Sequence, residues 1–254
     1  MRLGAANAPD LAVRKLRISS AKPAGRWSIT GNEATGFGVL KGGVKFVAGY
    51  PITPATEILE WLAHAIPQCG GELVQAEDEL ASINMILGAS FGGKPSMTAT
   101  AGPGLSLMTE ALGLGVASET PIVVVDVMRS GPSTGIATKS EQSDLNIAVY
   151  GMHGDAPHVV TAPLSVSDCL LTAQWSVHLA ETLQTPVIML SDQSLGQARV
   201  VIDRPADVAF GTGRLTPVEP IEDYARYALT ESGVSAMSIP GMAGGQYTAD
   251  SLTH

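Results

Sequence analysis

Four short segments of this 254-residue chain carry the side chains best suited to chemistry. They are Tyr50-Pro-Ile-Thr-Pro54, Glu77-Asp-Glu79, Gly102-Pro-Gly104, and Arg129 with the Ser/Gly/Thr-rich residues after it. A positioned carboxylate can serve as a general acid or base, an arginine can bind a carboxylate through two hydrogen bonds, and glycines let the backbone approach a ligand closely. Each segment is therefore a candidate for binding or catalysis.

Two prolines shape the first segment. Proline fixes its own φ at about −65° and biases the residue before it, here Tyr50 and Thr53, away from helical geometry. The loop is therefore predicted to be rigid, with the Thr53 hydroxyl held at a defined place. A structural alternative stays open, in which Thr53 or Thr56 only caps the following helix.

Glu79 stands out among the three acids of the second segment. Acids at the amino terminus of a helix favour its dipole, which accounts for one or two of them. Glu79, however, shares a helical face with Ile83 and Ile86, so its carboxylate is directed toward apolar surface, where a charge is costly without a partner. This placement favours a general acid or base over a plain helix cap. Small residues along the same helix would permit close contact with another subunit.

The last two segments follow apolar strands. Gly102-Pro-Gly104 suits either close backbone approach to a ligand or a tight turn, and Leu107 breaks the Gly-x-Gly-x-x-Gly dinucleotide pattern. Arg129 leaves the most apolar strand of the chain and enters a flexible loop, where it is well placed to bind a carboxylate. A surface arginine without a ligand is the simpler alternative.

Composition excludes several classes of function. A net charge of −9 with scattered basic residues argues against nucleic acid as a partner. The sequence contains no long apolar run and no secretory signal, so neither membrane insertion nor secretion is expected. The expected location is therefore the cytoplasm. Cys69 and Cys169 are expected to be reduced core thiols, and neither they nor the five histidines have the spacing of metal ligands.

Alternating apolar and amphipathic segments predict an α/β fold, a parallel sheet with helices on both faces. Residues 1–25 are expected to be a tail, residues 26–200 the folded domain, and residues 201–254 a linker to a further domain that this sequence lacks. The expected elements are helix 32–41, strand 44–48, helix 55–65, strand 73–75, helix 79–91, strand 96–100, helix 105–117, strand 122–127, helix 166–183 and strand 187–191.

Taken in order, four longer motifs resemble the alpha subunit of 2-oxoacid:ferredoxin oxidoreductases, and most closely the 2-oxoglutarate type. They are Tyr50–Pro54, Gln75–Asn84, Thr98–Met108 and Asp126–Gly135, with further likeness at Gly154–Pro157 and Ser232–Gly241. The resemblance implies a thiamine diphosphate-binding fold, with the domain at 26–200 binding the pyrimidine ring. It also implies oxidative decarboxylation of a 2-oxoacid, with coenzyme A taking the acyl group and ferredoxin the electrons.

The same resemblance assigns roles to single residues. Glu79 would be catalytic, through a hydrogen bond to the aminopyrimidine N1′, and Thr53 and Arg129 would bind the 2-oxoacid. The cofactor would further be contacted by Tyr50, Pro51, Ile52, Pro54, Thr100, Gly102, Pro103 and Gly104. No residue of this chain would bind metal, since Mg²⁺, the diphosphate and a [4Fe–4S] cluster would belong to the partner beta subunit.

Alternatives remain at this point. Family members often carry an amino-terminal gamma-type domain and a further carboxyl-terminal domain, so this chain is expected to be a partial subunit that is inactive alone. Pyruvate or a branched-chain 2-oxoacid could replace 2-oxoglutarate, because size discrimination depends on pocket residues that one subunit supplies only in part. A non-catalytic Rossmann-like module, with Glu79 as a helix cap, is the alternative from another class.

Overall fold

The computed structural model describes residues 25–248 apart from 211, 212 and 219. The expected tail at 1–25 thus lies almost wholly outside the described residues. The helices and strands in chain order are β1 (Arg26–Thr30), α2 (Gly31–Lys41), β2 (Phe46–Gly49), α3 (Thr56–Ala65), the 3₁₀ helix η1 (Ile66–Cys69), β3 (Glu72–Gln75), α4 (Glu79–Phe91), β4 (Ser96–Thr100), α5 (Gly102–Ala117), β5 (Val123–Met128), α6 (Leu145–Tyr150), β6 (Val159–Thr161), α7 (Val166–Leu183), β7 (Val187–Asp192), α8 (Gln193–Gln197) and β8 (Arg199–Asp203).

Six strands form one parallel sheet in the order β3-β2-β4-β5-β7-β6. The neighbouring strands β5 and β7 are buried along their whole length. Their register pairs Val123 with Val187 and Met128 with Asp192, so the carboxyl ends of the two strands are level. A parallel sheet of this kind reads as continuous apolar runs because helices cover both faces.

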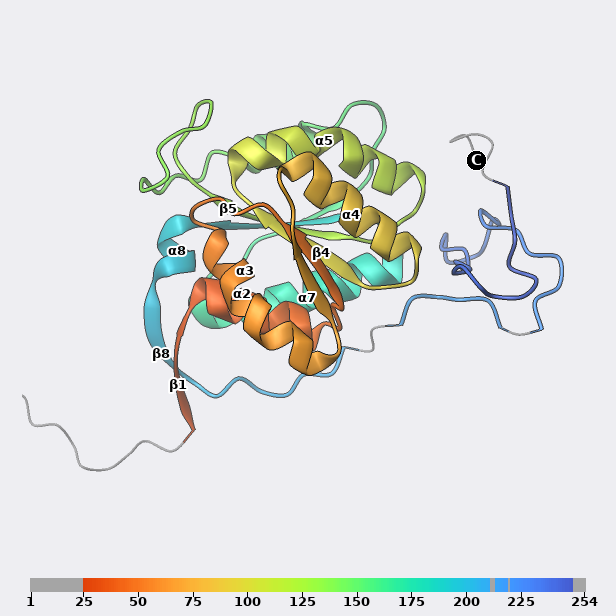
Figure 1. The fold of residues 1–254 in the computed structure, drawn as a ribbon, viewed down its shortest axis with the longest axis horizontal. Helices are drawn as coiled ribbons and strands as arrows, with labels where there is room; N and C mark the ends of the chain where they lie inside the picture. The colour runs from red at the N-terminus through yellow and green to blue at the C-terminus, as the bar shows by residue number, and fades with distance from the viewer. Residues whose placement is uncertain (1–24, 211–212, 219, 249–254) are drawn as a thin grey trace, which may run out of the picture.

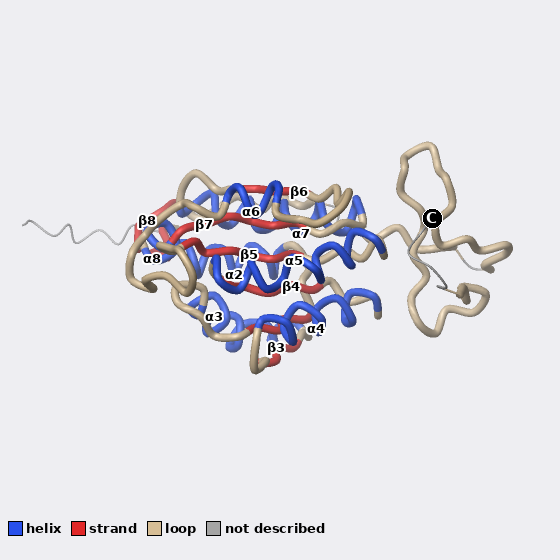
Figure 2. Tube along the Cα trace, turned by 90° about the horizontal axis from the view of Figure 1, so that it is seen from above, coloured by secondary structure: helices blue, strands red, loops and turns tan. Residues whose placement is uncertain are grey.

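Helices enclose the sheet from both sides, as Figures 1 and 2 show. α2, α3 and α7 pack on one face around a core cluster that includes Ile58 and Val177. α4, α5 and α6 pack on the other face around a cluster that includes Ile83 and Met108. The predicted α/β architecture, a parallel sheet flanked by helices on both faces, is confirmed.

Sequence patterns placed most elements well. The predicted helices at 79–91 and 166–183 and the strand at 96–100 have the bounds observed for α4, α7 and β4. α5 begins at Gly102, three residues earlier than predicted, because proline is tolerated in the first turn of a helix. Gly102-Pro-Gly104 is therefore the first turn of α5 and not a loop that precedes it.

A small antiparallel ribbon was not predicted. β1 pairs with β8 along its whole length, from Arg26 opposite Asp203 to Thr30 opposite Arg199. The last strand expected from the sequence is 187–191, so β8 was not expected, and the expected domain boundary at residue 200 falls inside it. β8 is exposed at four of its five positions, so it lacks the alternation of apolar and polar residues that reveals a strand.

Two buried arginines attach the carboxyl-terminal segment to the domain. Arg214 forms a salt bridge of 2.9 Å with Glu181 of α7, and both side chains are at most 6% exposed. Arg226 binds Glu119, just after α5, at 2.7 Å. The described residues beyond β8 contain no helix or strand, yet these ion pairs hold them beside the amino ends of the strands.

Candidate active site

The strand order reverses between β2 and β4. From β2 the chain runs outward to the edge strand β3 and then returns across β2 to β4. Parallel α/β sheets bind ligands outside the carboxyl ends of the strands at such a reversal. The segments that follow β2, β3 and β4 there are the Tyr50–Pro54 loop, Glu79 and the Gly102 turn. The topology therefore gathers three of the four predicted segments at one edge, and Arg129 follows the adjacent strand β5.

The acids at the start of α4 divide their roles. Asp78 is the helix cap, because its Oδ1 accepts a hydrogen bond of 2.6 Å from the Ala81 amide. Glu77 is exposed, whereas Glu79 is only 7% exposed. Within the described part of the chain, no residue donates a hydrogen bond to the Glu79 carboxylate. Glu79 is thus the predicted buried carboxylate that lacks a protein partner.

Gly104 of α5 lies directly against this carboxylate. A Cβ at position 104 would be 2.7 Å from Glu79 Cγ and 2.9 Å from its Oε1, and it would overlap Thr100 Oγ1. Real Cβ atoms do not approach other atoms so closely, so only glycine fits between the two side chains. Glu79, Thr100 and Gly104 therefore form one packed group from α4, β4 and α5.

Thr53 and Arg129 form a second group. Arg129 Nη1 donates to the Thr53 carbonyl at 2.7 Å and Nη2 donates to the Thr134 carbonyl at 2.5 Å, while Nε is buried without a partner. α3 begins after Ala55 with no side-chain cap, so neither threonine of the alternative, Thr53 or Thr56, caps it. Thr53 itself is exposed at the sheet edge.

A cavity of about 300 Å³ lies between Arg129 of this second group and α5. Gly102 and Pro103 line it from the first turn of α5, and Arg129 and Asp144 line it from the loop after β5. The opposite side of that helical turn bears Gly104, which contacts Glu79. The first turn of α5 is therefore shared by both groups.

The loop between β5 and α6 is anchored by Asp192 at the end of β7. This contact was not predicted from the sequence. Asp192 Oδ2 accepts a hydrogen bond of 2.7 Å from Gln142 Nε2, and Oδ1 caps α8 through the Leu195 amide at 2.8 Å. An acid that directly follows a buried strand and precedes a helix is the sequence signal that indicates such an anchor.

Two acids lie near each other where β5 leads into the same loop. Asp126 of β5 is fully buried, and Asp144, the residue before α6, is close enough for its charge to act on it. Burial, and then the nearby Asp144 charge, raise the pKa of Asp126 well above its usual range. Burial, with the nearby Glu141 charge adding to it, also raises the pKa of Asp144. Asp126 Oδ1 and Oδ2 are buried without a hydrogen-bond partner among the described residues, so the neutral, protonated form of Asp126 costs less to bury than the charged form.

Replacing Asp126 by Asn is expected to stabilise the protein increasingly as pH rises. The folded state binds the Asp126 proton more tightly than the unfolded state, so wild-type stability falls as pH rises from the unfolded pKa, near 4, through the raised folded pKa. An asparagine side chain has the same size and stays neutral at every pH. The free energy of unfolding of Asp126→Asn should exceed that of wild type by about 1 kcal/mol or more at pH 8.

Thermal unfolding at pH 5 and pH 8 checks this expectation. The exposed acid Asp203, replaced by Asn as the matched control, should change stability little at either pH, because exposed ion pairs contribute little. A Tm difference between Asp126→Asn and wild type that is the same at both pH values would contradict a raised pKa of Asp126.

The remaining predicted residues occupy varied environments. Tyr50 is 36% exposed and Pro51 is exposed, while Ile52 packs against a core cluster. Pro54 is buried, and its carbonyl accepts a hydrogen bond of 3.0 Å from Asn32 Nδ2, a contact that the sequence did not predict. The loop therefore presents its first residues and Thr53 outward and fixes its end inside the protein.

The expectation for the cysteines is half wrong. Cys169 is buried, and burial raises the pKa of its thiol to about 12. Cys69, expected in the core, is instead exposed at the end of η1. No group of three or more His, Cys, Asp or Glu residues in the described ranges could hold a metal ion. Among the described helices, none is both long and apolar enough to cross a membrane.

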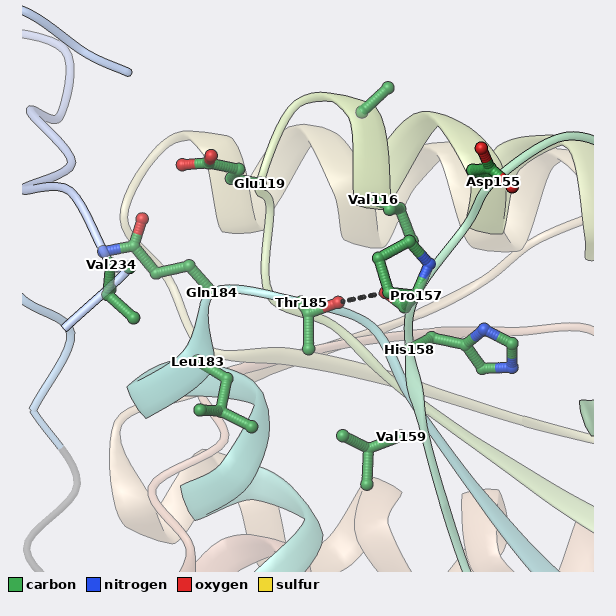
Figure 3. Close-up of a pocket in the computed structure, with 12 residues that line it drawn as sticks. Val116, Glu119, Asp155, Pro157, His158, Val159, Leu183, Gln184, Thr185 and Val234 are labelled. Carbon is green, nitrogen blue, oxygen red and sulfur yellow. Dashed lines mark hydrogen bonds between the residues drawn. The ribbon is translucent and has the colours of Figure 1, made fainter. Parts of the chain in front are cut away.

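A larger cavity of about 580 Å³ lies at the opposite edge of the sheet, near the amino ends of the strands (Figure 3). Several of its polar groups already have partners. Thr185 Oγ1 donates to the Pro157 carbonyl at 3.1 Å, Glu119 binds Arg226, and both ring nitrogens of His158 contact backbone carbonyls. Fewer polar side chains are therefore available to bind a ligand in this cavity than at the carboxyl ends of the strands.

Comparison with known proteins finds one matching family and several similar chains. The family model described as "Pyruvate flavodoxin/ferredoxin oxidoreductase, thiamine diP-bdg" matches residues 37–242. The 2-oxoglutarate synthase subunit KorA of Archaeoglobus fulgidus is 44% identical over 200 residues, covering 79% of this chain and 55% of the relative. The 2-oxoglutarate oxidoreductase subunit KorA of Mycobacterium tuberculosis is 42% identical over 224 residues, covering 85% of this chain and 34% of the relative.

A solved structure is similar over nearly the whole chain. The 2-oxoglutarate:ferredoxin oxidoreductase from Magnetococcus marinus, with 2-oxoglutarate, coenzyme A and succinyl-CoA bound, superposes with a TM-score of 0.87 at 47% identity. The match covers 92% of this chain and 41% of the Magnetococcus chain. The chain thus spans about half or less of the length of these relatives. It belongs to the thiamine diphosphate-binding family of pyruvate flavodoxin/ferredoxin oxidoreductases.

Proposed function

We propose that this chain supplies the pyrimidine-binding half of the active site of a 2-oxoglutarate:ferredoxin oxidoreductase, which converts 2-oxoglutarate and coenzyme A into succinyl-CoA and CO₂. The observation that carries the proposal is the Glu79 carboxylate, buried without a protein donor and packed against Gly104. A buried carboxylate is stable only with a partner, and a ring nitrogen of a bound ligand can be that partner.

The residues around Glu79 fit thiamine diphosphate. Glu79 would accept a hydrogen bond at N1′ of the aminopyrimidine, and the missing Cβ of Gly104 leaves its carboxylate room to do so. Bound thiamine diphosphate supplies the reactive carbon that adds to the 2-oxo group and accepts the electrons freed by decarboxylation. Contacts from Tyr50, Pro51, Ile52, Pro54, Thr100, Gly102 and Pro103 are proposed to complete this half of the cofactor site.

Thr53 and Arg129 are proposed to bind the 2-oxoacid. Arg129 has a buried Nε–H without a partner, a donor suited to a carboxylate, and it lines the cavity of about 300 Å³. The Thr53 backbone lies beside Arg129, since Arg129 Nη1 donates to the Thr53 carbonyl at 2.7 Å. 2-Oxoglutarate is the substrate proposed because the Magnetococcus relative has it bound and because relatives at 42–44% identity are 2-oxoglutarate enzymes.

A beta subunit is proposed as the partner, with Mg²⁺ and a [4Fe–4S] cluster in that subunit and ferredoxin as electron acceptor. Two cysteines are too few to ligate such a cluster, so this chain cannot hold it alone. The outer surface of α4 and α5 exposes large apolar side chains, among them Leu80, Met85 and Leu107. Gly88 and Gly113 on the same helices have open space where a Cβ would stand. Exposed apolar surface next to an incomplete site favours a subunit interface there.

A charge on this surface is expected to weaken subunit association. Leu107 is 50% exposed on α5, so Leu107→Glu should leave the chain folded while placing a charge in a desolvated interface. We expect at least about a tenfold loss of affinity for the beta subunit, measured by titration of one purified subunit with the other.

Leu171→Glu is the matched control, because Leu171 is 41% exposed on α7, which covers the other face of the sheet. Equal effects of the two substitutions would refute α4 and α5 as the interface.

The experiment that tests the function is reconstitution with the beta subunit. The assembled enzyme, with thiamine diphosphate and Mg²⁺, should reduce ferredoxin on addition of 2-oxoglutarate and coenzyme A. In competition, pyruvate or a branched-chain 2-oxoacid should be used with a lower kcat/KM. A higher kcat/KM for either competitor would replace 2-oxoglutarate as the substrate, and no turnover with any 2-oxoacid would refute the enzyme assignment.

A further inference from the structure

Two consecutive carbonyls of the Tyr50–Pro54 loop are held by side chains from distant elements. The Thr53 carbonyl accepts a hydrogen bond of 2.7 Å from Arg129 Nη1, and the Pro54 carbonyl accepts one of 3.0 Å from Asn32 Nδ2. Within the loop, the Thr56 amide donates to the Ile52 carbonyl at 3.0 Å. Because the helix start at Ala55 has no side-chain cap, Arg129 and Asn32 are the side chains that fix the orientation of Thr53.

Asn32 is itself held tightly. It is 1% exposed in the first turn of α2, and its Nδ2 also donates to Glu57 Oε2 at 3.0 Å. Its Oδ1 faces Gly196 of α8, where an added Cβ would lie 2.6 Å away. The amide can therefore neither swing away from the loop nor be replaced by a longer side chain.

The hydrogen-bond pattern requires an amide at this position. Both groups that Nδ2 contacts, the Pro54 carbonyl and the Glu57 carboxylate, can only accept hydrogen bonds. Glu57 is in turn oriented from outside by Gln197 Nε2, which donates to Oε1 at 2.9 Å. A chain of side-chain bonds thus runs from exposed α8 through Glu57 to the buried Asn32 and the loop.

We infer that Asn32 is a positioning residue for the substrate: through the Pro54 carbonyl it sets the place of the Thr53 hydroxyl beside Arg129. Asn32 acts this way only if Thr53 contacts the 2-oxoacid, as proposed above. Loss of its bond would let the loop shift while Glu79 and Gly104, on other elements, keep their positions. The affinity for the 2-oxoacid should then fall more than that for thiamine diphosphate, which residues of the same loop are proposed to contact only as part of a larger set that includes Glu79, Thr100 and Gly102.

Asn32→Ser in the assembled enzyme tests the inference. We expect the KM for 2-oxoglutarate to rise about three- to tenfold, which corresponds to the loss of one hydrogen bond, with kcat and thiamine diphosphate affinity each reduced by a smaller factor. Combined with Thr53→Ala, the substitution should add little further increase in KM, because both changes act on the same contact.

Gln197→Ala keeps the inference testable if Asn32→Ser fails to fold. Gln197 is exposed, so its removal should leave the fold intact and raise the KM in the same direction by a smaller factor. Gln68→Ala is the matched control, since Gln68 is an exposed glutamine with a single bond, to the nearby His64 carbonyl, at the far end of α3. Its KM should equal that of wild type.

Failure of the inference about Asn32 can be distinguished from failure of the substrate contact proposed for Thr53. If Thr53→Ala raises the KM while Asn32→Ser and Gln197→Ala only lower Tm, Asn32 is purely structural and the inference is overturned. An increase in KM that is additive with that of Thr53→Ala would overturn it as well. If Thr53→Ala leaves the KM of every 2-oxoacid unchanged, the substrate contact assigned to Thr53 fails instead.

Discussion

Replacing Glu79 by Gln is expected to reduce turnover of the assembled enzyme by at least about a hundredfold, the factor typical of losing a positioned acid or base. Glutamine keeps the size of the side chain and its contact with Gly104, but it cannot take up and return a proton. The fold should persist, because an unpaired buried carboxylate is replaced by a neutral group that costs less to bury. The rate of ferredoxin reduction at saturating 2-oxoglutarate and coenzyme A measures the effect.

Glu77→Gln is the control for this substitution. Glu77 is exposed two residues earlier, in the same acidic segment, so the loss of its charge tests any general effect of net charge near α4. Its turnover should remain within about twofold of wild type. Turnover of Glu79→Gln in that same range would remove Glu79 from the catalytic mechanism and favour a non-catalytic module.

Much of the site follows from the sequence because local rules and topology agree. Pro51 and Pro54 predict one rigid loop. Continuous apolar runs such as Val123–Met128 predict strands that are buried on both faces, as in a parallel sheet. The apolar face shared by Glu79 and Ile83 predicted a buried carboxylate, which the structure shows. Since parallel strands end at one edge, residues far apart in the chain could be assigned to one place.

The parts that were missed depend on contacts between distant residues. Nothing beside Asn32 in the chain reveals that its amide meets the Pro54 carbonyl, 22 residues away. Asp126 reads as the end of an apolar strand, and only the fold brings Asp144 to it. β8 was overlooked because its partner β1 lies more than 160 residues earlier and the ribbon is exposed. Such pairs leave no periodic signal in a single sequence.

Replacing Gly104 by Ala is expected to damage both stability and turnover. The new Cβ would overlap Thr100 Oγ1 and lie 2.7 Å from Glu79 Cγ, so either α5 or the Glu79 carboxylate must move. Thr100 is fully buried on β4 and has no free space into which to turn. Overpacking of this kind costs about 1–3 kcal/mol, and a displaced carboxylate reduces the rate by about a hundredfold per ångström. Thermal unfolding and turnover of the assembled enzyme measure the two effects.

Gly113→Ala in the same helix is the control for Gly104→Ala. It separates the effect of steric overlap from the effect of replacing glycine by a residue with higher helix propensity. Position 113 has no atom within 4 Å of an added Cβ, so alanine there should raise the stability of the isolated subunit by up to about 1 kcal/mol. Adding Thr100→Ala to Gly104→Ala removes the overlapping hydroxyl and should restore part of the lost stability. It should not restore turnover, because the Cβ still crowds Glu79 Cγ and Oε1. Recovery of full turnover in the double variant would show that position 104 must be glycine only to make room for the Thr100 side chain. The close contact between α5 and Glu79 would then have no part in catalysis.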